Sequence, residues 1–476
     1  MPFSWRRIWA ALLPLVVALA LAPAAFAQSG STEERVRDLE RQVEQLKAEI
    51  AALKSGQAGD QAGDADRVTE LERRLEVLAG EIEKMKIGEA AVSADQSEHG
   101  FGPAASKIYR AERGISIGGY GELFYQHAEE EEKEVIVVPS TKEEGEEEEE
   151  EEEGGDQFDL RRAVLYFGYK WNDRILFNSE IEYEHAGEEV SVEFAYLDFL
   201  WRPQANFRAG LVLLPVGFLN ELHEPTVFLG ANRPDVERLI LPSTWKEDGF
   251  GLFGEAGPLT YRTYVVNGLD AEGFSDEGLR GGRQGGSEAH AEDLAWVGRL
   301  DYTGLPGFLV GGSVYMGKSG QDLETTGGGE IGVGTTIVEG HLEWRWRGLE
   351  FRALGVQADL DDVAELNRFL DLEGDESIGE KLKGYYLQLG YDLLAGRGNP
   401  GDGRALIPYT RWETYNTQDE VPAGFLANPA NDVESLTLGI AYKPIEQLIF
   451  KADYQNVDNE AGTGTDRFNL LLGYVF

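Results

Sequence analysis

The sequence predicts an all-β fold, a sixteen-stranded antiparallel transmembrane β-barrel preceded by an α-helical coiled coil. Three observations predict this fold class. From residue 115 onward, apolar and polar residues alternate with a period of two in stretches of about 9–13 residues, the length that a tilted strand needs to cross a bilayer. Short turns and long loops alternate between these stretches. The final stretch, Phe468–Phe476, carries large apolar residues on one parity, which is typical of a strand with one apolar face.

Composition removes several classes of protein. The 476 residues include 86 Asp and Glu but only 43 Lys and Arg, for a net charge of −43. Nucleic-acid binding needs a basic surface, so that class is excluded. The absence of cysteine removes thiol catalysis, Cys-ligated metals and disulfide bonds. Only one long apolar run exists, near the N-terminus, so a protein with several helical membrane spans is also excluded.

Residues 1–27 are predicted to be a secretory signal peptide. Arg6 and Arg7 form a basic start, residues 10–22 are apolar, and Ala25–Ala27 is an A-x-A cleavage site. The mature chain is therefore expected to begin at Gln28. The alternative is an uncleaved membrane anchor, which the shortness of the apolar stretch disfavours. The protein is expected to leave the cytoplasm.

Residues 28–110 are predicted to form a periplasmic coiled-coil segment. Apolar residues recur at alternating spacings of 3 and 4 over residues 32–54 and again over 67–87, which is a heptad pattern. The positions are Val36, Leu39, Val43, Leu46, Ile50 and Leu53, then Val68, Leu71, Leu75, Leu78, Ile82 and Met85. The second run is out of phase with the first, so two segments are expected. Two helices packed as a hairpin within one chain are the alternative.

Residues 111–476 are predicted to form the barrel. Sixteen strand candidates begin near Ile115, Phe158, Ile175, Val190, Asn206, Gly249, Leu259, Leu294, Phe308, Thr336, Leu349, Leu382, Arg404, Leu436, Leu448 and Phe468. The long connections are 128–157, 215–248, 268–292, 318–334, 359–380 and 417–434. An even strand number with alternating connection lengths is typical of outer-membrane barrels, and it places both ends of the barrel chain in the periplasm. The terminal Phe476 is the expected signal for the barrel-assembly machinery.

The connection 128–157 is predicted to be an acidic extracellular loop. Residues 129–153 hold fifteen Glu and two Lys. Blocks of like charge repel one another and stay solvated. A calcium or magnesium site is the functional alternative, because hard cations bind carboxylate oxygens. No spacing defines a geometry for such a site, so diffuse condensation of cations is favoured.

The alternation also predicts what faces the lumen. A charge at the bilayer midplane costs about 2–4 kcal/mol, so the apolar parity of each strand should face lipid and the charged parity should face inward. Charged side chains cannot line a dry core, and sixteen strands enclose a water-filled lumen. The predicted pore-lining residues are seven bases, seven acids and one histidine: Arg162, Lys170, Glu180, Glu182, Glu184, Arg208, Arg262, Arg299, Asp301, Glu339, His341, Glu343, Arg345, Lys451 and Asp453.

No catalytic, cofactor or metal site is predicted. The six histidines are scattered, and no H-x-x-x-H motif or helix with paired carboxylates occurs. A barrel esterase would need a serine, a histidine and a polar orienting group close together. Ser313 and His341 are one such pair, but no spacing requires them to meet. The protein is therefore not expected to be an enzyme.

The connection 215–248 is too apolar for a free surface loop, since it includes Phe218, Leu219, Val227 and Phe228. Folding inward against the barrel wall would bury these side chains and narrow the pore. The titratable residues of this predicted constriction loop include Glu221, His223, Glu224, Arg233, Asp235, Glu237, Arg238 and Lys246.

From about Gly118 to Phe476 the sequence resembles the phosphate-selective porin O and P family. The shared pattern is a strand leading into Gly-x-x-x-x-Pro-x-Gly at residues 210–217, an inserted loop with a late Arg238 and Trp245, and a glycine-rich strand after it. A coiled coil ahead of the barrel also fits. The resemblance implies a barrel of sixteen strands, usually a homotrimer, with constricting loops and with phosphate selectivity that depends on channel lysines and arginines.

The sequence departs from the family in its charges. Residues 215–248 hold six acids against three bases, and the predicted wall is mixed. A porin for passive diffusion of ions and small hydrophilic solutes, in the outer membrane of a Gram-negative-type bacterium, is therefore the favoured function. The first alternative is a phosphate- or oxyanion-selective porin. The second is a structural anchor with a periplasmic coiled-coil tether, for which each heptad segment, about 30 Å long, is short.

Overall fold

The computed structural model of the protein describes residues 97–111, 113–128, 155–325, 327–396 and 403–476, together with eight residues between 41 and 74. The chain divides into two compact units, Met1–Lys86 and Ile87–Phe476. The eight described residues of the first unit are helical, and they are Arg41, Val43, Gln45, Leu46, Lys47, Ile50, Leu71 and Arg74. The predicted signal peptide, the pairing of the heptad segments and the acidic tract 129–153 lie outside the described residues.

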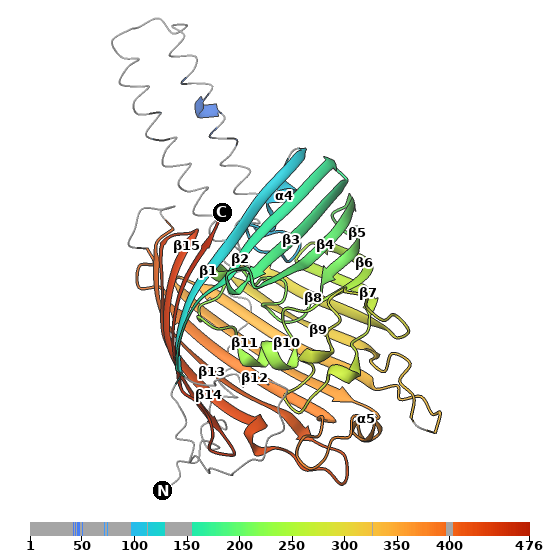
Figure 1. The fold of residues 1–476 in the computed structure, drawn as a ribbon. Coiled ribbons are helices and arrows are strands. Elements are labelled where there is room, and N and C mark those ends of the chain that lie inside the picture. The colour runs from blue at the N-terminus through green and yellow to red at the C-terminus, as the bar shows by residue number, and fades with distance from the viewer. Residues whose placement is uncertain are drawn as a thin grey trace, which may run out of the picture. The chain divides into compact units, whose positions relative to one another are not determined.

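The second unit is a closed antiparallel barrel of sixteen strands, which confirms the predicted barrel (Figure 1). The strands are β1 (Gly114–Ala128), β2 (Gly155–Asn172), β3 (Ile175–Glu184), β4 (Glu189–Arg202), β5 (Ala205–Leu213), β6 (Lys246–Ala256), β7 (Leu259–Asn267), β8 (Leu294–Leu305), β9 (Phe308–Lys318), β10 (Gly334–Trp346), β11 (Leu349–Leu360), β12 (Lys381–Tyr391), β13 (Ala405–Glu420), β14 (Asp432–Ile445), β15 (Leu448–Asn459) and β16 (Arg467–Val475). Consecutive strands pair, and β1 closes the ring against β16, with Tyr120 opposite Val475. Each strand begins within four residues of its predicted start.

Tight turns join most strands at one end of the barrel, which we call the turn end, and most of the connections at the opposite loop end are longer. The first strand starts and the last strand ends at the turn end. Three connections depart from the predicted alternation: 185–188 and 460–466 are short but lie at the loop end, and 392–404 is longer but lies at the turn end. The alternation of connection lengths is therefore less strict than the sequence indicates.

Along each strand, the side chains that point outward are mostly apolar and exposed, whereas those that point inward are mostly buried and include the charged ones. Ile115, Leu300 and Leu438 are each more than half exposed. Glu180, in contrast, is fully buried. The alternation predicted for β2, β3 and β10 is the one observed. This distribution inverts that of a soluble protein. No helix of the described residues is long and apolar enough to cross a membrane.

Short helices occupy the connections and the segment ahead of β1. They are α4 (Lys107–Arg110), η1 (His185–Gly187), η2 (Pro225–Val227), the π-helix η3 (Val236–Ile240), η4 (Ala271–Gly273), η5 (Arg280–Gly282), α5 (Val363–Phe369) and η6 (Pro429–Asn431). The last of the α-helices, α5, stands at the loop end (Figure 1). Two of these helices, η2 and η3, belong to the connection between β5 and β6, which enters the barrel.

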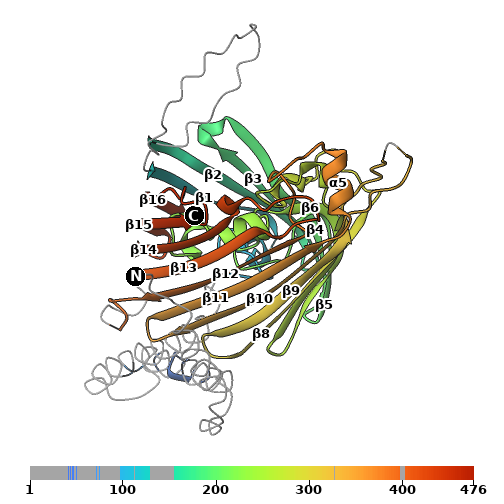
Figure 2. The same ribbon diagram turned by 90° about the horizontal axis from the view of Figure 1, so that it is seen from below.

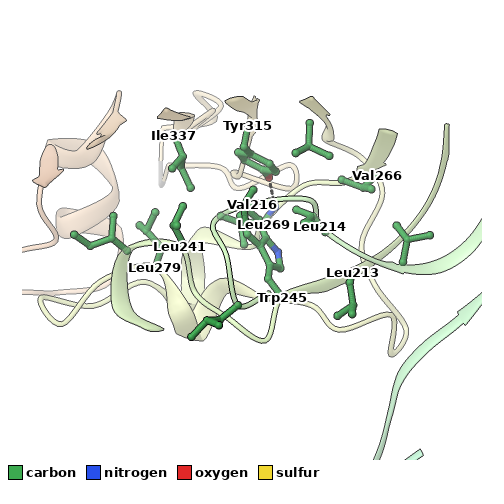
Figure 3. Close-up of a cluster of buried hydrophobic side chains, with 14 of the residues drawn as sticks. Leu213, Leu214, Val216, Leu241, Trp245, Val266, Leu269, Leu279, Tyr315 and Ile337 are labelled. Carbon is green, nitrogen blue, oxygen red and sulfur yellow. Dashed lines mark hydrogen bonds between the residues drawn. The ribbon is translucent and has the colours of Figure 1, made fainter. Parts of the chain in front are cut away.

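An apolar core fills part of the barrel interior beside β7, β9 and β10 (Figure 3). Trp245 is fully buried, and its ring centroid lies 4.7 Å from that of Tyr315. The Tyr315 hydroxyl accepts a hydrogen bond of 3.1 Å from the backbone N–H of Leu269. Leu241 and Leu279, from two different loops, belong to the same cluster. The predicted water-filled lumen is therefore partly an apolar core, because two long loops fold inward and pack on the wall.

Candidate functional site

The connection 214–245 between β5 and β6, which we call the inserted loop, lies inside the ring of strands (Figure 2, light green). Its base is closed by Asn220. The Asn220 side-chain amide donates to the carbonyls of Leu214 at 2.7 Å and Trp245 at 2.8 Å, and its oxygen accepts from the backbone N–H of Trp245 at 2.6 Å. One buried asparagine thus holds both ends of the loop together.

Basic side chains of the far wall hold the backbone carbonyls of the inserted loop. The donors and the residues whose carbonyls they reach are Lys443 to Thr226 at 2.7 Å, Arg352 to Val227 at 2.8 Å, Lys451 to Gly230 at 2.8 Å, Arg411 to Asn232 at 3.2 Å, and Arg299 to Gly217. Charge-assisted hydrogen bonds of this kind are stronger than neutral ones. Arg299 and Lys451, predicted to line the pore, therefore serve to position the loop.

Carboxylates hold the backbone N–H groups of the same loop. Asp453 accepts from Ala231 at 2.7 Å, and Glu413 accepts from Asp235 at 2.6 Å. Within the loop, Glu237 accepts from the N–H groups of Phe218 and Leu219, each at 2.8 Å, and from the Tyr386 hydroxyl at 2.7 Å. The loop is thus bound to the wall through both its donors and its acceptors.

Several of the residues predicted to line the pore form buried ion pairs with one another or with neighbouring residues. Arg208 pairs with Asp198 at 2.8 Å, and both are almost fully buried. Arg262 pairs with Glu221 at 2.9 Å and with Asp301 at 2.7 Å, while Arg299 also reaches Asp301 at 2.8 Å. Asp301 and Glu339 further bind the two ring nitrogens of His341 at 2.8 and 2.9 Å. Charges arranged in such pairs hold the wall together and leave little field for a passing solute.

On strands β1 to β3, acidic residues outnumber the bases that they face. Arg162 contacts Glu182 at 2.8 Å and both Glu122 and Glu184 at 3.1 Å. His223 of the inserted loop bonds to Glu180 of β3 at 3.0 Å. Burial alone would lower the pKa of His223, but the Glu180 carboxylate outweighs it and raises that pKa above its ordinary value. The structure thus brings together five of the predicted residues: Arg162, Glu180, Glu182, Glu184 and His223.

The most exposed charged residue of the inserted loop is the base Arg238. Glu221, Glu224 and Glu237 are at most 5% exposed, and Asp235 is 9% exposed. The Arg238 side chain, in contrast, is 45% exposed although it contacts Asp235 at 3.1 Å. The side chain of Lys246, which follows the loop at the start of β6, is 15% exposed, close to the 13% of the Asp235 side chain, and it pairs with Glu193 at 2.6 Å. Four of the six acids counted in residues 215–248 are therefore largely buried, and Arg238 is the charge that the inserted loop presents most openly.

Arginines of the next loop, 268–293, extend this basic surface. Arg280 and Arg283 donate to the carbonyls of Ser243 and Thr244 at the end of the inserted loop. Arg280 lies within electrostatic reach of Arg162, Arg233, Arg238 and Arg283, and its burial and these neighbours lower its pKa to about 9. The predicted set omits Arg280 and Arg283 because they lie in a loop without period. It also omits Arg352, Arg411 and Lys443, although their inward parity was a usable signal.

Residues 97–111 also lie inside the barrel, although residues 97–110 were predicted to belong to the periplasmic segment 28–110. Phe101 and Ile108 are each 1% exposed and belong to the interior core. The backbone N–H groups of Ala104 and Ala105 donate to one Glu224 oxygen at 2.9 and 3.1 Å. Burial outweighs these bonds and raises the pKa of Glu224 to about 7. The stretch has no heptad period, so nothing in its pattern required a helix outside the barrel.

Of the remaining predicted residues, three stay at the wall near the turn end. Arg345 contacts Glu343 at 3.2 Å and is 27% exposed. Lys170 donates to the carbonyl of Tyr109 at 2.7 Å. Phe476 lies at the seam between β1 and β16.

Ser313 and His341 lie on adjacent strands, but both imidazole nitrogens face carboxylates. Within the described residues no three His, Asp or Glu side chains are grouped as a metal site.

Comparison with known proteins identifies a relative in Aquifex aeolicus (strain VF5). An uncharacterized protein of that organism is 34% identical over 393 residues, which span 79% of this chain and 83% of the relative. No model of a known protein family matches the sequence. The resemblance to the phosphate-selective porin O and P family is therefore not confirmed and stays a prediction.

Solved barrels are similar in fold at low identity. OmpF of Salmonella typhi, in a complex with daunomycin, is 11% identical with a TM-score of 0.47, and the match covers 78% of this chain and 99% of that one. The outer membrane channel DcaP of Acinetobacter baumannii is 10% identical with a TM-score of 0.46, covering 76% and 97%. An anion-selective porin from Comamonas acidovorans is 9% identical with a TM-score of 0.44, covering 77% and 100%.

Proposed function

We propose that this chain, which belongs to the same family as the uncharacterized Aquifex aeolicus protein, is an outer-membrane channel for passive diffusion of ions and small hydrophilic solutes. One observation carries the proposal. A closed barrel has an apolar exterior and a charged interior, and it holds an inserted loop across its lumen. In a barrel of this kind the backbone polar groups are hydrogen-bonded between strands, so they can lie in lipid while the interior stays aqueous.

The exterior supports a membrane location. Large apolar side chains stay exposed on nearly every strand, among them Trp171 at 49%, Trp296 at 44% and Trp346 at 53%. Soluble monomers rarely expose apolar patches of more than a few hundred Å². Aromatic side chains near strand ends are also typical of the girdles at membrane interfaces. Lipid is therefore the partner that fits this surface.

The interior supports a path for solutes. The accessible charges inside the ring include Arg162 at 17%, Glu184 at 28% and Arg345 at 27% side-chain exposure. These groups are ion-paired within the wall, but their exposed parts remain accessible to water inside the ring. The inserted loop, bound on both sides, would set the narrowest part of that path. Weak interactions with several charged groups would favour passage over retention.

The topology supports an orientation. In outer-membrane barrels the short turns face the periplasm and the long loops face outward. By this rule the turn end, the coiled-coil segment and Phe476 lie on the periplasmic side, where the barrel-assembly machinery would bind the closing strand. A homotrimer is implied by the family resemblance, and the heptads of residues 32–54 and 67–87 are suited to associate such copies.

Purified protein in a planar bilayer tests the proposal. Stepwise, ohmic current increments are expected when the protein inserts, with reversal potentials close to zero under a KCl gradient. A protein that inserts into liposomes but carries no current would instead be a structural anchor. Heat-modifiable mobility of the same sample, which reports a folded barrel, distinguishes that result from failure to fold.

Preference for oxyanions is a second candidate, and the arginines in and beside the inserted loop favour it. The inserted loop buries its acids but leaves Arg238 half exposed, and Arg233, Arg280 and Arg283 are only partly buried. Guanidinium groups match the geometry of phosphate oxygens. The test is the reversal potential under a KCl gradient, followed by titration with phosphate. Strong anion selectivity with block of chloride current by micromolar phosphate supports this candidate, whereas weak cation preference supports simple diffusion.

A further inference from the structure

The segment 97–111 spans the inner face of seven consecutive strands at the turn end. From β2, Lys170 donates to the carbonyl of Tyr109, and from β3, Asn178 donates to the carbonyl of Ala105 at 3.1 Å. At the far side, the ring of His99 lies 5.0 Å from that of Phe253 on β6. The four other strands, β1, β4, β5 and β7, contact the segment through Gly118, Tyr196, Arg208 and Arg262. The segment thus covers nearly half of the wall at this end.

The wall is shaped to receive the segment. A Cβ atom added at Gly168 would lie 2.8 Å from the Ile108 side chain, and one at Gly118 would lie 2.9 Å from the carbonyl oxygen of Ala104. On the segment, a Cβ at Gly102 would lie 2.4 Å from the Glu224 carboxyl carbon. Glycine at these positions permits an approach that a side chain would block. The fit is therefore specific and not a loose filling of the lumen.

The barrel is complete without this segment. All sixteen strands pair into a closed ring, and no residue of 97–111 belongs to that ring. The segment instead bonds to itself around Ser106. The Ser106 hydroxyl accepts from the N–H of Glu98 at 2.9 Å and donates to the carbonyl of Phe101 at 3.1 Å. It is therefore a compact body that can leave its seat without breaking the strand ladder.

The segment is held both by apolar burial and by hydrogen bonds that water can replace. The Tyr109 hydroxyl donates to Asp198 at 2.7 Å and accepts from Arg208 at 2.9 Å. The Asp198–Arg208 pair would remain intact if the tyrosine left. The N–H groups of Ala104 and Ala105 bind one oxygen of Glu224. Phe101 and Ile108 are the large apolar anchors.

We propose that segment 97–111 is a displaceable plug of the channel. Seated, it closes the β1 to β7 side of the turn-end opening and contacts the inserted loop through Glu224. Withdrawn toward the preceding chain, it opens that side of the lumen and frees Glu224. The proposal rests on the channel function proposed above, and it adds that the channel has two conducting states.

A disulfide tests the plug directly. A Cβ at Gly168 would lie 3.0 Å from the Cβ of Ile108, so the two Cβ atoms must move apart by about half an ångström to reach the roughly 3.5–4.5 Å of natural disulfides. The chain has no native cysteine to compete. Single channels of the Ile108→Cys, Gly168→Cys variant are recorded in planar bilayers, oxidised and then reduced with dithiothreitol. Wild type and the reduced variant should alternate between two levels. The oxidised variant should show only the lower level.

The single variants Ile108→Cys and Gly168→Cys are the controls and should not respond to reduction. Identical traces of the double variant before and after reduction would overturn the plug and leave the channel proposal standing. Absence of current in wild type would overturn the channel proposal itself. The two failures are therefore distinguishable.

A second variant tests the plug if the double-cysteine protein does not fold. Tyr109→Phe removes the hydroxyl from Asp198 and Arg208 but keeps the ring. It should lengthen the dwell time in the higher level several-fold. Arg110→Ala, an exposed residue of the same segment, is the matched control and should behave as wild type. Unchanged dwell times in Tyr109→Phe would contradict the plug.

Discussion

Phe476, the last residue, exchanges two backbone hydrogen bonds with Gly119 of the first strand. The N–H of Phe476 donates to the Gly119 carbonyl at 2.9 Å, and the N–H of Gly119 donates to the Phe476 carbonyl at 3.1 Å. The Phe476 ring covers Gly119, since a Cβ at that glycine would lie 2.7 Å from the ring. The end of the chain thus closes the barrel through its backbone as well as its aromatic face.

Deletion of Phe476 should reduce the yield of assembled barrel several-fold while secretion continues. The deletion removes both hydrogen bonds at the β1–β16 seam and the aromatic residue that the assembly machinery is expected to bind. The measurement is the heat-modifiable band in outer-membrane fractions. Phe468→Ala, which removes an exposed ring of β16 but keeps the seam, should assemble normally. Equal yields for the deletion and wild type would contradict the prediction.

Glu224 should make the barrel more stable at low pH. Burial raises its pKa to about 7, with Glu180 acting in the same direction and His223 and the N–H groups of Ala104 and Ala105 opposing it. The folded state therefore binds a proton that the unfolded state releases near pH 4.5. The resulting stabilisation, up to about 3 kcal/mol, is complete below pH 4.5 and is lost as pH rises to 7.

The thermal midpoint of the protein in detergent, followed by circular dichroism from pH 4.5 to 8, measures this effect. Glu224→Gln keeps the hydrogen-bond acceptor and should flatten the pH dependence relative to wild type. Glu365→Gln, on the exposed face of α5, is the control for general charge effects. If wild type and Glu224→Gln show the same pH slope, the assignment to Glu224 is wrong.

Glu237→Ala should loosen the inserted loop. The substitution leaves the N–H groups of Phe218 and Leu219 and the Tyr386 hydroxyl without their acceptor. Each buried polar group left unpaired costs about 1–3 kcal/mol. Noisier single-channel current and a lower thermal midpoint are expected. Tyr386→Phe, which removes one donor but no acceptor, should show a smaller change of both. A quiet channel with a wild-type midpoint would show that the loop does not depend on this carboxylate.

The pair Arg233→Gln and Arg238→Gln should shift ion selectivity toward cations. Both arginines belong to the inserted loop, which buries most of its acids. Removing two positive charges changes the field that ions meet, and the shift should shrink at high salt because charges are screened within about 8 Å at physiological ionic strength. The measurement is the reversal potential under a KCl gradient. Arg368→Gln, an exposed residue of α5, should leave it unchanged.

The strands, and the side of the sheet on which each side chain lies, could be predicted from the sequence. The reason is local: a side chain that faces lipid must be apolar. A strand such as β10 must alternate Val338, Leu342 and Trp344 outward with Glu339 and Glu343 inward, whatever the rest of the chain does. The turns between strands are also local. Sixteen strand positions and the inward course of an apolar loop were therefore predictable from residue order.

Whether an inward-facing charged side chain lines the pore or binds a loop could not be predicted from residue order. Lys451 and Gly230, which share a hydrogen bond of 2.8 Å, are 221 residues apart in sequence, and the acceptor is a backbone carbonyl that any residue type provides. Whether an inward base faces water or holds a loop depends on where that loop lies in three dimensions. The hydrogen bonds from Ala104 and Ala105 to Glu224 inside the barrel could not be predicted for the same reason. Their donors are backbone N–H groups, which every residue type except proline provides.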